Sequence, residues 1–262
     1  MLRALYTSAS GMQAQQMNLD IIANNLANVN TTGFKKSKIE FQDMLYQTSR
    51  AAGADAGGGN QVPTSMQVGH GARAVATSRV FTNGELHQTG DKLDVAIHGN
   101  GFFKVTMPDG TDAFSRDGAF KMSNAGGIVT SDGLPVASFA GITIPSNATN
   151  VSISTSGAVS TTVDGTTSTV GQIMLSRFVN PGGMEAIGGS LYKSTLAAGT
   201  EETGLPSANG MGSVQQGWLE LSNVKVVEEM VNLIKAQRAY EINSKAIKAA
   251  DEMMQMSNRL RG

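Results

Sequence analysis

Apolar residues recur every seven positions at both ends of the chain. Near the C-terminus the repeat runs without a break through Val226, Leu233, Tyr240, Ile247 and Met254. Near the N-terminus it runs through Leu5, Met12, Leu19 and Leu26, with Ile22 and Val29 beside it. A seven-residue repeat forms an apolar seam along a helix, and another helix must cover that seam. The pattern therefore predicts two long terminal helices that pair in the manner of a coiled coil.

The C-terminal helix is expected to extend from Ser222 to Leu260. Ser222 is a favourable N-cap residue, and Glu228 and Glu229 suit the positive end of the helix dipole. At 1.5 Å per residue this helix would be roughly 58 Å long, which is more than a small domain requires. A helix lying on its own globular core is the alternative. The matching repeat at the other end of the chain favours an assembly instead.

The N-terminal helix has few charges for a helix in water. Between Met1 and Phe34 the charged side chains are Arg3 and Asp20, and the other polar positions carry amides and hydroxyls. Asn is a poor helix former, whereas amides suit polar surface that is buried against other chains. We expect both terminal helices to be weakly folded before assembly, and Gly33 to end the first one as a left-handed C-cap.

The residue pattern in the middle of the chain changes twice. Residues Gln47–Gly69 contain several glycines and Pro63 and lack a strong period, which predicts an extended, adaptable segment; a disordered linker is the equal alternative. From Arg73 onward, short alternating runs are separated by Asx-Gly pairs, which favour tight hairpins. The expected strands include 94–97, 102–105, 113–116, 119–122, 127–130, 172–178 and 191–193, with a Thr/Ser/Val-rich zone at 142–169.

These patterns predict an α+β fold, in which a mainly antiparallel β region interrupts a helical domain made of both termini. The expected boundaries are a helical domain at 1–34 and 218–262, a connecting and packing segment at 35–72, and a β-rich domain at 73–217. The antiparallel centre follows from the hairpin turns, and the discontinuous helical domain follows from the matched repeats.

Composition and candidate chemistry add mainly exclusions. The net charge of −1 argues against nucleic acid or an anionic membrane as the main partner. Cysteine is absent, so disulfides and thiolate metal sites are excluded. No apolar run approaches membrane-spanning length, and no basic region precedes an apolar one as in a secretory signal. His70, His87 and His98 lack metal-ligand spacing. We expect no enzyme activity, no cofactor, no metal site and no direct membrane insertion.

Both termini also resemble a known family. The stretch from Ala23 to Lys35 and the stretches Ser222–Val224 and Gln237–Lys245 are similar to the terminal signatures of the bacterial flagellar rod and hook family. The signature residues are Asn24, Asn25, Leu26, Asn28, Thr32, Gly33 and Phe34, and then Gln237, Arg238, Ala239, Tyr240 and Asn243. Between them, Gly99–Phe103 and Phe114–Gly118 resemble the β region that the family shares. The resemblance covers nearly the whole chain.

The resemblance implies an architecture and a set of partners. Both terminal helices would form an inner tube and the β-rich domain an outer shell, in a helical homopolymer that transmits torque and serves as an export channel. It also implies contacts with other rod subunits, the hook protein and the surrounding basal-body rings. Export by the flagellar type III apparatus without a cleavable signal, and assembly in the periplasm, are implied as well.

Within the family, the length and the Gln47–Gly69 segment point to the distal-rod member. A proximal-rod or hook subunit of the same family is the nearest alternative, although a hook protein usually carries a larger β insertion. A secreted fibre or adhesin with a helical oligomerisation stalk is an alternative of a different class. Such an adhesin would normally carry a cleavable signal and would need only one helical stalk.

Overall fold

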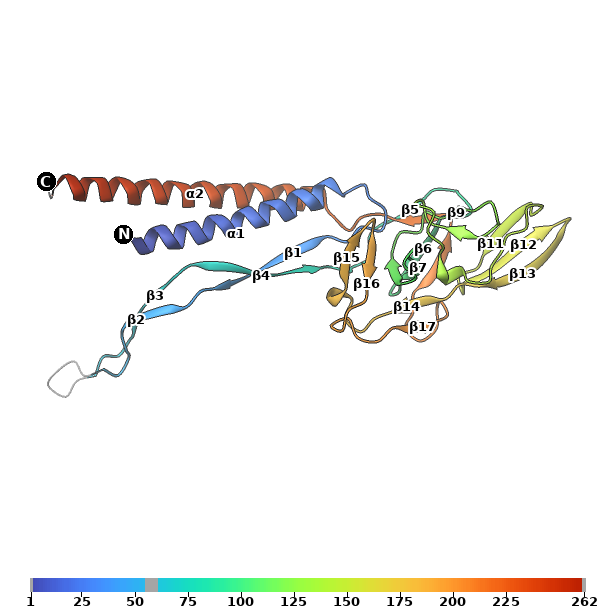
Figure 1. Cartoon of the computed structure of the whole chain (residues 1–262), viewed down its shortest axis with the longest axis horizontal. Coiled ribbons are helices and arrows are strands. Elements are labelled where there is room, and N and C mark those ends of the chain that lie inside the picture. Colours follow the sequence, from blue (N-terminus) through green and yellow to red (C-terminus); the bar gives the residue numbers. More distant parts are fainter. Residues whose placement is uncertain (1, 55–60, 261–262) are drawn as a thin grey trace. The chain divides into compact units, whose positions relative to one another are not determined.

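The computed structural model describes residues 2–54 and 61–260 of the chain. The contacts between residues divide the chain into two compact units, and each unit is discontinuous in sequence (Figure 1). Unit 1 contains Met1–Leu26, Ser37–Ser78 and Lys225–Gly262, and unit 2 contains Ala27–Lys36 and Arg79–Val224. No helix in the described part of the chain is both long enough and apolar enough to cross a membrane.

Unit 1 contains the two long helices, α1 (Leu2–Ala27) and α2 (Val226–Arg259). They run antiparallel, because Asn25 near the end of α1 contacts Glu229 near the start of α2, at 3.4 Å between the amide nitrogen and the carboxylate. Farther along, a methyl group at Gly11 would lie 3.0 Å from the amide nitrogen of Asn243. The two predicted terminal helices are therefore confirmed.

The helix ends differ from the prediction. Ser222 is not the N-cap of α2, because its hydroxyl accepts a hydrogen bond from the Val224 amide in the preceding turn, at 3.3 Å. The helix begins four residues later, after Lys225, and Glu228 and Glu229 occupy its first turn. Gly33 does have a positive φ of 66°, but α1 has already ended at Ala27. Gly33 therefore belongs to the segment that follows the helix and is not its C-cap.

The buried side chains of the two helices are mostly small or polar. On α2 they are Glu229, Ala236 and Ala250, and the partly buried Asn243 completes this row with a spacing of seven. On α1 they are Ala14, Ile22 and Asn25. Small residues on a helix face allow close approach of a neighbouring helix. The helices therefore meet through rows beside the predicted apolar seams, and a coiled-coil pairing of those seams is not confirmed.

Between the helices in sequence, unit 1 contains a two-stranded ribbon. Strand β1 (Ser37–Asp43) pairs with β4 (Ala72–Arg79), and β2 (Tyr46–Arg50) pairs antiparallel with β3 (Met66–Gly69). Within Gln47–Gly69, which was expected to be either extended or disordered, the described ends are paired strands, while residues 55–60 lie outside the described part. No strands were predicted here. Most of these side chains are exposed, although Ile39 of β1 is buried, so burial leaves only a weak mark on the sequence of these strands.

Unit 2 is the mainly antiparallel β region that was predicted. Its strands are β5 (Leu86–Gln88), β6 (Val95–His98), β7 (Phe103–Thr106), β8 (Asp112–Ser115), β9 (Lys121–Met122), β10 (Ile128–Val129), β11 (Asn150–Ile153), β12 (Ala158–Val163), β13 (Thr166–Gln172), β14 (Leu175–Arg177), β15 (Glu185–Gly188), β16 (Leu191–Lys193), β17 (Glu202–Gly204), β18 (Ser213–Gln216) and β19 (Trp218–Glu220). The largest sheet has the order β15-β16-β8-β7. At the β12–β13 turn, Asp164 and Gly165 adopt φ of 49° and 79°, as the Asx-Gly signal predicts.

Aromatic side chains fill two neighbouring cores of unit 2. Phe103, Phe120 and Phe139 lie in the larger cluster, where the rings of Phe103 and Phe120 meet edge to face at 4.9 Å. Phe114 and Tyr192 lie in the smaller cluster. The last strands return to the first ones, because β18 pairs with β6 and β19 pairs with β5. This closure brings Glu220 beside the segments that begin unit 2.

The boundaries of the compact units differ from the three segments expected from the sequence. Residues 27–36 and 218–224 belong with the β strands, and residues 37–78 belong with the helices. The assignment of these segments to a tube, a packing element and a shell stays a prediction.

Candidate functional site

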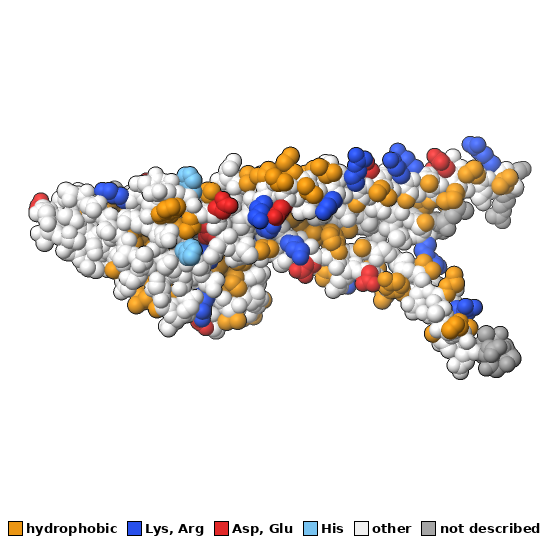
Figure 2. Space-filling view, turned by 180° about the vertical axis from the view of Figure 1, so that it is seen from behind, with side chains coloured by type: hydrophobic (Ala, Val, Ile, Leu, Met, Phe, Trp, Pro, Cys, Tyr) orange, Lys and Arg blue, Asp and Glu red, His pale blue; other side chains and the backbone are white. Residues whose placement is uncertain are grey.

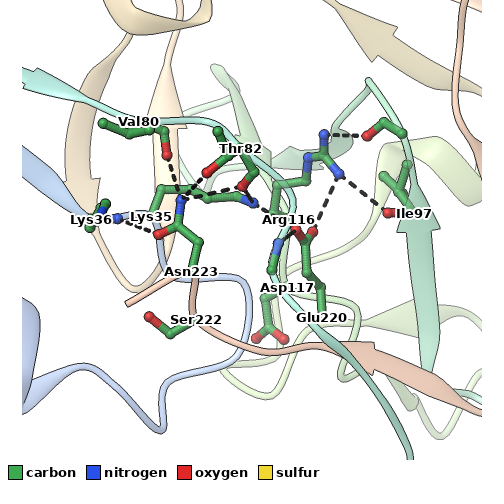
Figure 3. Close-up of polar contacts among 12 residues, drawn as sticks. Lys35, Lys36, Val80, Thr82, Ile97, Arg116, Asp117, Glu220, Ser222 and Asn223 are labelled. Carbon is green, nitrogen blue, oxygen red and sulfur yellow. Dashed lines mark hydrogen bonds and ion pairs between the residues drawn. The ribbon is translucent and has the colours of Figure 1, made fainter. Parts of the chain in front are cut away.

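The chain enters and leaves unit 2 through two segments that lie side by side. The first is 33–36, which follows α1, and the second is 220–223, which precedes α2. The Gly33 amide donates to the carbonyl of Glu220 at 2.8 Å, and the Val80 amide donates to the carbonyl of Lys36 at 3.0 Å. Residues that are almost 200 positions apart are thus joined by the backbone itself, in the region drawn in Figure 3.

The side chain of Asn223 fastens these segments together. Its carbonyl oxygen accepts from the Lys36 amide at 2.8 Å, and its nitrogen donates to the carbonyl of Val80 at 2.8 Å (Figure 3). The same nitrogen lies 3.0 Å from the Thr82 hydroxyl. One amide group therefore satisfies a backbone donor on one segment and a backbone acceptor on another, as a neighbouring strand would do.

A buried ion cluster lies beside Asn223 and consists of Lys35, Arg116 and Glu220. The Lys35 ammonium lies 2.6 Å from one carboxylate oxygen of Glu220, and the Arg116 guanidinium lies 3.3 Å from the other. The side chains of Lys35 and Glu220 are completely buried, and that of Arg116 is 2% exposed. We call these three residues the ion cluster.

Backbone groups satisfy most of the remaining hydrogen-bonding capacity of the ion cluster. Lys35 donates to the carbonyl of Thr82 at 2.7 Å, and Arg116 donates to that of Gly99 at 2.7 Å. Glu220 accepts from the Gly84 amide at 2.7 Å. Thr82 and Gly84 lie on the loop before β5, and Gly99 lies on the loop after β6. The ion cluster therefore joins the entering and leaving segments to the loops before β5 and after β6.

Burial acts on the charges of the ion cluster. It lowers the pKa of Lys35, and the negative charge of Glu220 opposes that shift. Burial likewise lowers the pKa of Arg116, again opposed by Glu220. A buried charge is tolerated when it is paired and hydrogen-bonded, and only Nε of Arg116 lacks a hydrogen-bond partner in this cluster as the structure describes it. Both cations depend on the same carboxylate, so Glu220 is the member whose loss would leave the most charge uncompensated.

Aromatic and guanidinium groups cover the N-terminal segment of this region. The Arg79 guanidinium lies 5.6 Å from the ring centres of both Phe34 and Tyr192 and donates to the carbonyl of Lys35 at 3.0 Å. Burial raises the pKa of Tyr192, and Arg79 opposes that effect. Phe34, a signature residue, is thus buried beside the guanidinium group that also contacts Tyr192.

Asn25 has a comparable role within unit 1. Its side chain is buried, its nitrogen donates to the carbonyl of Ser37 and its oxygen accepts from the amide of Ser37, both at 2.9 Å. The amide of Asn25 therefore joins the end of α1 to the first residue of β1. Of the N-terminal signature, the structure buries Asn25, Gly33 and Phe34, leaves Leu26, Asn28 and Thr32 half-buried, and leaves Asn24 exposed.

The predicted assembly seams remain partly accessible in the single chain. The N-terminal residues Leu5, Met12, Leu19, Leu26 and Val29 are half-buried, and Ile22 is buried. In the C-terminal seam Leu233, Ile247 and Met254 are half-buried, and Val226 and Tyr240 are exposed. Of the C-terminal signature, Gln237, Arg238 and Tyr240 are exposed, and Ala239 and Asn243 are half-buried. Their role in assembly stays a prediction.

The sequence did not point to Glu220, Arg116 or Arg79 as a group. Lys35 and Arg116 lie within the recognised stretches, but a charge pair separated by 185 positions carries no local pattern. Within the described residues no group of three or more His, Asp or Glu side chains is placed to hold a metal ion. The arrangement is suited to joining distant segments rigidly.

Three models of protein families match parts of the chain. The model described as flagella basal body rod protein matches residues 5–35. The model described as flagellar hook protein FlgE/F/G D1 domain matches residues 96–161. The model described as flagellar basal body rod FlgEFG protein C-terminal matches residues 215–260. The matches include nearly all of both helices and both segments that meet at the ion cluster.

Curated proteins are similar over the full length. The flagellar basal-body rod protein FlgG of Borreliella burgdorferi is 49% identical over 265 residues, covering 100% of this chain and 99% of that protein. FlgG of Buchnera aphidicola subsp. Acyrthosiphon pisum is 46% identical and covers 99% and 100%. The flagellar hook protein FlgE of Helicobacter pylori is 44% identical, but over only 52% of this chain and 19% of that protein.

Proposed function

This chain belongs to the flagellar rod and hook protein family, and from that premise we infer that it is a structural subunit of the bacterial flagellar basal-body rod. The observation that carries this conclusion is its full-length similarity to FlgG proteins, at 49% and 46% identity in the two cases given above. Its role is mechanical rather than catalytic and serves motility. The chain associates with copies of itself and with other rod and hook subunits.

We propose the distal part of the rod as its position. The similarity to the two FlgG relatives covers 99% and 100% of those proteins, whereas the similarity to the hook protein covers 19% of that protein. The described ends of the Gln47–Gly69 segment, which suggested the distal-rod member, form part of the two-stranded ribbon of unit 1. A hook or proximal-rod subunit is the alternative within the family.

In the proposed rod, α1 and α2 form the tube and unit 2 forms the outer shell. The exposed and half-buried apolar positions of both helices support this arrangement, because apolar helix faces require cover. The tube transmits torque from the motor to the hook and serves as an export channel. The chain is exported by the flagellar type III apparatus without signal cleavage, assembles in the periplasm and contacts the surrounding rings.

Gene replacement tests this proposal. The gene of a FlgG relative would be deleted in a motile bacterium, this chain would be supplied in its place, and basal bodies would be purified and imaged. We expect complete rods that contain this chain and restored swimming. A chain that enters the hook or the medium, but not the rod, would contradict the proposal.

Two variants compared in the same strain distinguish a defect in rod assembly from a defect in expression. Leu196→Ala changes a fully exposed side chain in unit 2 and should support rods as the unmodified chain does. Leu19→Asp changes a half-buried position of α1 and should not. Equal rod formation by both variants would mean that α1 does not form the tube.

A further inference from the structure

A groove runs between α1 and the ribbon of unit 1. It has a volume of about 440 Å³ and is lined by Met17 and Ile21 of α1, by Ile39 of β1 and by residues around Val75 of β4. Ile39 is buried, and Met17 and Val75 are 42% and 49% exposed. The groove also contains one charged residue, Asp20. We call this the ribbon groove.

A row of exposed aliphatic residues lies on the first turns of α2. Val227, Val231 and Ile234 have spacings of four and three, so they share one face of the helix, and they are 75%, 44% and 55% exposed. Lys235 and Arg238 follow within the next turn and are exposed as well. Figure 2 shows hydrophobic side chains over the start of this helix and Lys and Arg side chains farther along it. We call Val227, Val231 and Ile234 the α2 ridge.

The α2 ridge does not pack against α1 of the same copy. A helix turns by about 100° per residue. The ridge residues therefore lie roughly 140–200° around α2 from Glu229, which contacts Asn25 of α1. The ridge thus points away from α1. Exposed aliphatic rows of this kind mark contacts with another molecule.

The two surfaces are complementary in chemistry. The ribbon groove is apolar with one acid, and the α2 ridge is apolar and is followed by two cations, Lys235 and Arg238, of which Arg238 also pairs with the exposed Glu241 at 3.5 Å. Asp20 is one of only two charged residues in the described part of α1, so the negative charge of this helix is concentrated in the groove. Opposite charges at an interface fix the register and suppress wrong pairings.

We propose that the ribbon groove binds the α2 ridge of a second copy of this chain, with Lys235 or Arg238 facing Asp20. The inference rests on the proposed function and specifies which surfaces of the subunits meet. Each copy has one groove and one ridge on different faces, so the contact is heterologous. Heterologous contacts that do not close into a ring generate open helical filaments, the form that a rod requires.

Disulfide trapping tests the contact directly, because the chain contains no cysteine. Val75→Cys would be mixed with Val231→Cys, the mixture would be assembled into rods, and these would be oxidised. We expect a mixed dimer of the two variants as the main product. The background control is Leu196→Cys, which changes a fully exposed position in unit 2. Each of the two variants alone should form homodimers only at the level seen with this control.

The outcomes separate the contact from the proposed function. Rods without the mixed dimer would overturn this contact and leave the rod assignment intact. A dominant dimer between Val75→Cys and Leu45→Cys, which changes an exposed residue beside β2, would assign the groove to the ribbon of the second copy and would also overturn the contact. Failure of the cysteine-free chain to form rods would count against the proposed function itself.

A charge exchange gives a second readout that does not depend on oxidation. Asp20→Lys should raise the critical concentration for assembly by roughly tenfold, because like charges then meet in the groove. Asp20→Lys combined with Lys235→Asp and Arg238→Asp should recover most of that loss. A combined variant that assembles no better than Asp20→Lys alone would show that these charges do not meet.

Discussion

Glu220 is the residue on which the ends of unit 2 depend most. Its carboxylate compensates two buried cations, and its backbone carbonyl accepts from Gly33. Buried ion clusters contribute little net free energy when complete, but removal of one partner leaves an uncompensated charge. The same residue is unremarkable in the sequence, because neither its neighbours nor its spacing indicates burial.

Glu220→Gln should lower the free energy of unfolding of unit 2 by about 3–5 kcal/mol, because Lys35 and Arg116 would remain buried without a counter-charge. Urea denaturation of the full chain, followed by the fluorescence of Trp218, measures the effect. The matched control is Glu202→Gln, which removes a partly exposed ion pair with Arg177 and should cost about 1 kcal/mol or less. Equal losses in the two variants would refute the assigned role of the ion cluster.

Gly33 combines two constraints that an added methyl group would violate. Its φ is 66°, and a Cβ atom there would lie 2.5 Å from the Asp117 amide nitrogen. Gly110 has a φ of 80° with nothing within 4 Å. Gly110→Ala should cost about 1–2 kcal/mol from backbone strain alone, and Gly33→Ala about 1–3 kcal/mol more because of the clash. Thermal unfolding of both variants tests this, and equal melting temperatures would contradict the tight packing at Gly33.

Asp117 makes the stability of unit 2 depend on pH. Burial raises its pKa above the ordinary value, and the charge of Asp94 acts in the same direction. Between the ordinary and the raised pKa the folded state binds more protons than the unfolded state. The contribution of Asp117 to stability is therefore fully present below the ordinary pKa and decreases as the pH rises through the raised one. Asp117→Asn should remove this slope, as measured by urea denaturation from pH 3 to pH 7. An unchanged slope would contradict the assignment.

At the scale of elements, both helices could be predicted, because their apolar repeats are long and local. Their contact could not, because the covered row of α2 consists of Glu229, Ala236, Asn243 and Ala250, and the buried residues of α1 include Ala14 and Asn25 as well as Ile22. Small residues do not produce an apolar periodicity. The apolar repeats that can be seen in the sequence are the partly accessible seams. Their accessibility is consistent with contacts to other copies of the chain.

The seams give a prediction about assembly. Leu19→Asp and Ile247→Asp each place a charge at a half-buried apolar position of α1 or α2. Loss of aliphatic burial contributes about 1.5–3 kcal/mol per contact, and the unpaired charge adds to it. The defect recurs at every subunit. We expect both variants to stay soluble and to fail in rod assembly, as measured by sedimentation.

Unit 2 provides the internal control for these variants. It contains neither residue 19 nor residue 247, so it should resist proteolysis and keep its melting transition. Normal rods from both variants would exclude the seams as assembly surfaces. A chain with unit 2 unfolded would show instead that the substitutions act through folding.

At the scale of the whole molecule, the antiparallel β region was predictable from its Asx-Gly turns, whereas the extent of unit 2 was not. Its boundary includes 27–36 and 218–224 because Asn223 and the ion cluster join these segments to the strands. Such contacts connect positions almost 200 residues apart and leave no local pattern. The ribbon was not predicted from the sequence, since most of its side chains are exposed and few of them contribute to a buried face.

The central claim is that this chain forms a rod whose tube is made by α1 and α2. Electron cryo-microscopy of filaments assembled from the purified chain tests it most directly. We predict straight, hollow filaments with helical order, in which the density of the two terminal helices surrounds the channel and unit 2 lies outside. Filaments whose channel is surrounded by unit 2, or a chain that stays monomeric under all assembly conditions, would contradict the account.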